Sequence, residues 1–198
     1  MTSKKTGSRM AGALQHRVTL SLVAAAFAAA ALAVPSLAST GTATISAGSF
    51  GFVSTPPNVS FSATLNGLDQ TVNATQALDV GDATGSGTGW NITATSTTFT
   101  TGGGSPHLLS TSATTVTSAP ADACDAGATC TLATNSVTYP YTLPAAAVAP
   151  TATKLYNAAA NTGMGNQTVT PTWKLAVPAN TFSGTYTSTW TLSLVSGP

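Results

Sequence analysis

The chain has 198 residues, of which only 6% are Asp, Glu, Lys or Arg, and its formal net charge at pH 7 is +1. Four of the six basic residues lie within the first 17 positions, so residues 39–198 keep two lysines against five aspartates, a formal charge of −3. Nucleic acids and anionic membrane surfaces are bound through clustered Lys and Arg. This composition therefore excludes both as partners.

The first 38 residues have the pattern of a secretory signal peptide. A basic region is followed by an apolar run over 18–34 and by the small-residue motif Ser36-Leu37-Ala38. We expect cleavage after Ala38, with residues 31–33 as a second site. The alternative is a membrane anchor, but the apolar run is short for a bilayer span, and the small residues that follow it favour cleavage. The sequence predicts a secreted protein that begins at Ser39 and has no membrane attachment.

Residues 39–198 are long enough for one domain and read as all-β. Apolar and polar residues alternate at period two, as in half-buried strands, and no regular helical pattern occurs. The expected strands are 42–47, 49–53, 59–65, 71–80, 90–94, 108–117, 137–143, 169–177 and 183–195. We expect residues 66–70 to form the loop of a hairpin and residues 119–131 to form a longer loop. Residues 154–160 can form either a short helix or a strand. Pro140 places 137–143 at a sheet edge. Two sheets closed over their apolar faces give an antiparallel β-sandwich of about nine or ten strands.

The two cysteines, Cys124 and Cys130, enclose five residues. In a secreted chain so close a pair predicts a local disulfide, with two free thiols as the alternative.

Side chains that carry catalysis or bind metals are scarce. His107 is the only histidine after residue 38, and it lies alone in a loop, so no serine nucleophile has a credible general base. No pair of carboxylates forms an enzymatic motif either. Two cysteines and one histidine do not make a zinc site. Asp79 precedes the glycine-rich stretch 81–89 and Asp82 lies at its start, so the two could bind calcium. The spacing of an EF-hand is absent, which favours a role in shaping the turn. We predict no enzyme, no metal and no cofactor.

Two tryptophan motifs lie far apart in the expected domain. Trp90-Asn91-Ile92, after the glycine-rich stretch, resembles the first motif of the WxL-domain surface proteins, with isoleucine where leucine is usual. Trp190-Thr191-Leu192, after residues 177–186 and near the C-terminus, resembles the second. The resemblance implies noncovalent attachment to the Gram-positive cell wall, with peptidoglycan or another wall glycan as the ligand. It also implies other surface proteins as partners.

The tryptophans have two interpretations that the sequence leaves open. Trp90, Trp173 and Trp190 can fill the sandwich core, where each buries a large apolar area. Alternatively, they can stack on sugar rings while polar neighbours meet the hydroxyl groups. On the second interpretation the ligand-binding residues are Trp90, Asn91, Trp190 and Leu192.

The leading hypothesis is thus a secreted surface protein that attaches to a wall glycan through a WxL-like domain. The alternative is a structural protein that assembles with itself into a surface fibre or layer by strand addition. Its basis is the low charge of the surface, which leaves sheet edges unprotected. An enzyme or a calcium-dependent adhesin is the third class.

Overall fold

Twelve β-strands and no helix occur in the residues that the computed structural model describes, 39–198. All strands belong to one body, residues 44–198, and the predicted signal peptide lies outside the described residues. The strands are β1 (Phe50–Phe52), β2 (Gln70–Thr75), β3 (Leu78–Asp82), β4 (Trp90–Thr97), β5 (Thr114–Val116), β6 (Ala121–Cys124), β7 (Tyr141–Thr142), β8 (Ala145–Ala146), β9 (Thr153–Ala158), β10 (Gly165–Thr170), β11 (Thr172–Val177) and β12 (Trp190–Ser196). The all-β class predicted from the alternation is confirmed.

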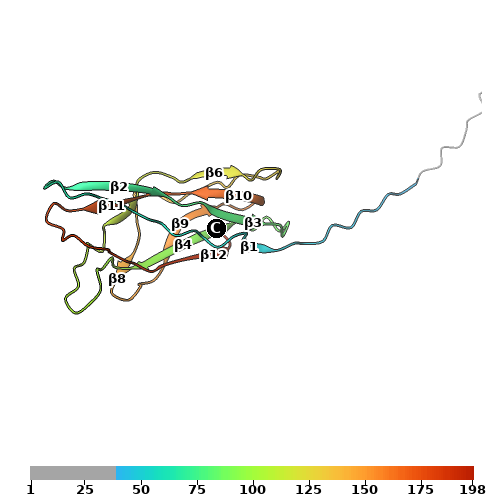
Figure 1. The fold of residues 1–198 in the computed structure, drawn as a ribbon. Coiled ribbons are helices and arrows are strands. Elements are labelled where there is room, and N and C mark those ends of the chain that lie inside the picture. Colours follow the sequence, from blue (N-terminus) through green and yellow to red (C-terminus); the bar gives the residue numbers. More distant parts are fainter. Residues whose placement is uncertain (1–38) are drawn as a thin grey trace, which may run out of the picture. The chain divides into compact units, whose positions relative to one another are not determined.

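One layer of the sandwich is built on two long, antiparallel runs of chain. β2 continues into β3 across two residues, and β10 continues into β11 across Pro171 alone. Gly165 pairs with Asp82 at one end and Val177 with Gln70 at the other, so the sheet β1-β3-β10-β6 runs on into the sheet β2-β11-β5-β7. Figure 1 shows β2, β11, β10 and β6 together on one side of the sandwich.

The second layer is centred on β4. This strand pairs with β12 on one side and with β9 and β8 on the other, and the β4–β8 pair is the parallel one in the described fold. Figure 1 shows β4, β8 and β12 on the side opposite β2 and β11. The apolar faces of the two layers enclose a core whose largest fully buried side chains include Trp90, Trp173, Leu78, Ile92, Leu143 and Leu155.

Two expected strands near the N-terminus are absent. Residues 42–47 form no strand, and only Phe50–Phe52 of the next expected strand pairs with β3. Residues 59–65 also form no strand, so the hairpin expected around 66–70 is wrong. The strand that should have been its second arm, β2, pairs with β11 instead. Alternation reports which face of an extended segment is apolar, but it does not say whether a neighbouring backbone lies within hydrogen-bonding distance.

The remaining differences have local causes. Proline has no N–H to donate, so the expected strand 169–177 is split at Pro171, and the Gln76 amide bonds to the Pro171 carbonyl oxygen at 3.2 Å beside the break. The ambiguous segment 154–160 is a strand, β9, and the expected loop 119–131 contains β6. β7 closes its sheet at an edge, as Pro140 predicts. β12 begins only at Trp190, later than the expected start at 183, and it pairs with β4.

Candidate functional site

Trp90 lies in the core and presents no face to a ligand in this structure. Its exposed fraction is 0%, and its indole N–H donates to the Gly163 carbonyl oxygen at 2.8 Å. Its ring packs on that of Tyr156, with centroids 6.1 Å apart. The neighbouring Asn91 is also buried, and its amide group donates to the Gly197 carbonyl oxygen at 2.7 Å. Both side chains tie β4 to other parts of the chain.

The glycine-rich stretch before Trp90 explains this burial. Gly85, Gly87 and Gly89 all have positive φ, the conformation that glycine adopts without strain. A Cβ on Gly89 would clash with the Ala158 carbonyl oxygen, so the absence of a side chain lets the turn lie directly on the chain after β9. Gly89 therefore brings backbone close to backbone at the end of β9, and Gly163 leaves the room that the Trp90 indole occupies.

Trp190 and Leu192, by contrast, are only half-buried. The Trp190 ring meets Trp173 edge-to-face with centroids 4.8 Å apart, and it lies 6.3 Å from Phe99 and 6.4 Å from Phe61. These rings come from four segments that are distant in the sequence. Trp173 itself is fully buried, and its indole N–H donates to the Gln76 side-chain oxygen at 3.0 Å.

A groove opens beside this aromatic cluster, between residues 55–65 and residues 181–192. It consists of two adjoining hollows of about 660 and 710 Å³ that share Val59, Ser60, Phe99 and Tyr186 in their walls. The first, here called the Phe61 hollow, lies between 59–65 and 181–186 over a floor that includes Val72, Leu175 and Val177. The second, the Trp190 hollow, lies between 55–60 and 186–192 and includes Gln76.

One wall of the groove is an extended segment with unpaired backbone. Within the described chain, no N–H or C=O group of residues 54–65 bonds to another backbone group. Two glutamine side chains hold the segment instead: Gln76 donates to the Pro57 carbonyl oxygen at 2.7 Å, and Gln70 donates to the Thr64 carbonyl oxygen at 2.9 Å. The segment thus runs antiparallel to β2 at the distance of a glutamine side chain.

The other wall also offers a free edge. β12 pairs only with β4, and residues 187 and 189 bond to Thr100, beyond the end of β4, and to Thr97, the last residue of β4. The side of this strand that faces away from β4 has no partner in the described structure. The described residues that line the two hollows include no Asp, Glu, Lys or Arg. The groove is therefore neutral and bounded by backbone that can still form hydrogen bonds.

The aspartates proposed as a calcium site lie in different environments. The Thr84 amide and hydroxyl donate to Asp82 Oδ1 at 3.0 and 2.7 Å, which confirms that Asp82 shapes the turn. Asp79 lies instead near Asp125, and burial together with this second carboxylate raises the pKa of Asp79. Within residues 39–198, no three His, Cys, Asp or Glu side chains cluster as metal ligands do.

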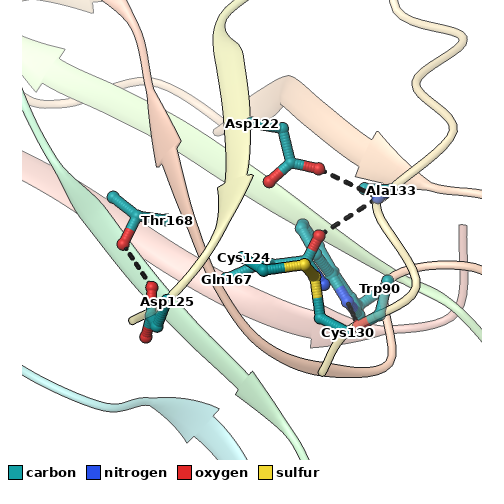
Figure 2. Close-up of a disulfide and its surroundings, with 9 residues drawn as sticks. Trp90, Asp122, Cys124, Asp125, Cys130, Ala133, Gln167 and Thr168 are labelled. Atoms are coloured by element: carbon teal, nitrogen blue, oxygen red, sulfur yellow. Dashed lines mark hydrogen bonds between the residues drawn. A yellow bond between two sulfur atoms is a disulfide. The ribbon is translucent and has the colours of Figure 1, made fainter. Parts of the chain in front are cut away.

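The predicted disulfide is present and closes a loop at the edge of the sandwich. Cys124 and Cys130 are bonded, with Cα atoms 5.6 Å apart. Figure 2 shows the loop beside Trp90, with the Thr168 hydroxyl donating to Asp125 at 2.7 Å. The chain after the loop returns to the region of Trp90, since the Thr131 carbonyl oxygen accepts a hydrogen bond from the Gly163 amide at 2.8 Å. A disulfide is compatible with an extracellular environment.

Comparison with other proteins adds no relative. No protein-family model, curated protein or solved structure matches this chain. The WxL resemblance therefore rests on the two tryptophan motifs alone. Among residues 39–198 no helix could cross a membrane.

Sequence reasoning named Trp190 and Leu192 but missed most of the groove. Phe61, Phe99 and Tyr186 line it and were assigned only to expected strands or to the segments between them. The available signals were the alternation over 59–65, which placed Phe61 on an apolar face, and that over 183–195, which placed Tyr186 on the face of Trp190. The groove arises because that segment does not pair, and no local pattern encodes a missing partner. Trp90 and Asn91 do not reach the groove and are absent from its lining.

Proposed function

We propose that this protein is a secreted, non-catalytic structural protein of the cell surface that assembles with other copies of itself by β-strand addition at the groove. The observation that carries the proposal is the extended segment 54–65, whose backbone is unpaired although its side chains Val59 and Phe61 pack against the core. A segment of this kind can accept a strand without any rearrangement of the core. Strand addition supplies affinity through main-chain hydrogen bonds and selectivity through alternate side chains.

The surface around the groove supports self-association in two further ways. Sheet edges in soluble proteins are normally protected by charged side chains, prolines or covering loops. Here β12 is an edge strand with no charged residue and no proline, and the groove lining is equally free of charge. In the opposite wall Pro56 and Pro57 protect only one end, so residues 58–65 are the part that can accept a strand. Two copies can therefore approach at this edge without electrostatic repulsion or the cost of removing water from ions.

A charge placed in the groove tests the proposal. Ser60 is exposed and lines both hollows, so Ser60→Lys should leave the fold intact and prevent strand addition. Thr71→Lys is the matched control, because Thr71 is exposed on β2 outside the lining. Sedimentation and electron microscopy of the chain that begins at Ser39 should show assembly for the parent and for Thr71→Lys only. A parent that stays monomeric at all concentrations, or a Ser60→Lys variant that assembles normally, would refute the proposal.

Wall-glycan attachment is the second candidate function, and the Trp190 hollow favours it. A half-exposed indole lies there beside polar side chains, including Asn58 and Gln76, and no charged group lines it. Aromatic faces with polar neighbours are the usual components of saccharide sites, although the faces of Trp190 are partly covered by other rings.

Sedimentation with purified peptidoglycan tests this candidate. Asn58→Ala should weaken sedimentation with the wall, whereas Asn73→Ala, an exposed asparagine on β2 outside the groove, should not. Both variants should melt at the temperature of the parent. Equal sedimentation of both variants, or none for the parent, would exclude the Trp190 hollow as a wall-binding site.

A further inference from the structure

The N-terminal arm, residues 39–47, has the pattern of a strand but pairs with no strand among residues 39–198. Threonine or serine occupies 40, 42, 44 and 46, while glycine, alanine and isoleucine occupy 41, 43, 45 and 47. All nine residues are exposed and none is in a strand. Ile45 is the one large apolar side chain of the arm, and its exposed fraction is 94%. Single exposed apolar residues are common on protein surfaces, so the exposure of Ile45 matters only together with the strand-like pattern around it and with a site elsewhere that can bury it.

The groove has the complementary composition. The arm has no charged side chain, and neither do the described residues that line the groove. The Phe61 hollow offers an apolar floor of Val72, Leu175 and Val177, with the half-buried Phe61 in its wall. Its bounding segment 59–65 is about 23 Å long, and the nine residues of the arm span about 30 Å when extended. The arm is thus long enough to fill the hollow as one strand.

A copy cannot place its own Ile45 in its own Phe61 hollow. The arm joins the body where the Gly48 amide bonds to the Ala83 carbonyl oxygen at 2.8 Å, just beyond β3. Val72 in the floor lies ten residues before Asp82 along β2 and β3, about 33 Å at the rise of a strand. Ile45 lies three positions before Gly48, a reach of about 10 Å. The acceptor must therefore belong to another molecule.

We propose that the arm of one copy is the strand that fills the groove of the next copy, with Ile45 in the Phe61 hollow. This inference rests on the proposed function and identifies the segment that supplies the added strand. The arm leaves the body at the β3 end and the hollow lies at the β2 end, so the contact joins two different surfaces. A contact of that kind repeats without closing on itself unless the rotation forms a ring, and an open filament is the expected product.

The test compares two charges at adjacent positions of the arm. Ile45→Asp places a carboxylate on the face that enters the hollow, and Thr44→Asp places the same charge on the opposite face. Both positions are exposed, so melting temperatures should match that of the parent. We expect Ile45→Asp to raise the concentration needed for assembly at least about tenfold, because a carboxylate loses its hydration in an apolar site. Thr44→Asp should assemble nearly as the parent does.

A second measurement uses the unmodified protein. A synthetic peptide of residues 39–47, added in excess, should occupy the grooves and prevent fibre growth, whereas the same peptide with Ile45→Asp should not. If the parent assembles but Ile45→Asp assembles equally and the peptide has no effect, the donor is a different segment and the proposed function stands. If a wall glycan prevents fibre growth but the peptide does not, the donor is likewise a different segment and the proposed function stands. If the parent does not assemble at all, both the donor and the proposed function are refuted.

Discussion

Replacing Trp90 with alanine distinguishes a core tryptophan from a ligand platform. The side chain has an exposed fraction of 0% and fills the space between β4 and the chain after β9. Tryptophan-to-alanine changes in cores cost about 3–5 kcal/mol, because apolar contacts are lost and a cavity remains. The change also removes the indole N–H that bonds to the Gly163 carbonyl oxygen at 2.8 Å, which adds about 1 kcal/mol if that oxygen stays buried.

The expected loss is thus about 4–6 kcal/mol. In a domain of this size each kcal/mol lowers the melting temperature by about 2–4 °C, so Trp90→Ala should melt about 10–20 °C below the parent. Circular dichroism during heating, with urea unfolding to obtain the free energy, measures this directly. Phe182→Ala is the control, because Phe182 is an aromatic residue with an exposed fraction of 62% and should shift the melting temperature by less than about 3 °C.

A Trp90→Ala variant that melts within about 3 °C of the parent would refute this reasoning. If that variant also lost sedimentation with peptidoglycan, the indole would be a binding residue, as the second interpretation of the motif holds. Loss of wall binding together with unfolding would say nothing about a direct contact.

Three further predictions concern the surroundings of the core. Gly163→Ala should destabilise the fold strongly, since Gly163 has a φ of 76° and a Cβ there would lie 2.5 Å from the Trp90 indole nitrogen; a melting temperature equal to that of the parent would contradict this. Serine at both Cys124 and Cys130 should cost only about 2 kcal/mol in urea unfolding, because the closed loop is short and hydrogen bonds to β10 also hold it; loss of the folded state would show the disulfide to be essential. Burial raises the pKa of Asp79 and of Asp122, so the folded state keeps protons that the unfolded state releases above about pH 4. Stability should therefore fall as the pH rises through the folded pKa values, and asparagine at both positions should flatten that dependence. A parent and a double variant with the same pH profile would exclude these two carboxyls as its source.

The sequence allowed the fold class to be predicted because its strands are amphipathic. Alternation located β4, β12 and the long runs around Leu78 and Trp173, whose apolar residues lie in or against the core. It placed the start of β12 at 183 rather than at Trp190. The same pattern misled at 59–65, where Val59 and Phe61 are indeed turned toward the core but the backbone stands too far from β2 to pair. The interruption at Pro171 was visible in the sequence as a missing N–H donor, although the register that sets Gln76 beside it was not.

The candidate site was harder to predict for a physical reason. Phe61, Phe99 and Trp190 meet only because three separate segments converge on Trp173, and no spacing in the chain encodes that convergence. The disulfide, in contrast, joins residues six apart and was predicted from that separation. The tryptophan motifs located residues that build the fold, and the groove lies beside only the second of them.

Amide hydrogen exchange of residues 55–65, all of which except Pro56 and Pro57 carry a backbone N–H, is the most direct test of strand addition. In the monomer these amides have no backbone partner and should exchange rapidly. In the assembled protein, alternate amides of this segment should be protected about 100-fold or more, because each then donates to the added strand. Assembly that leaves exchange at 55–65 unchanged would show that the groove is not where the copies join.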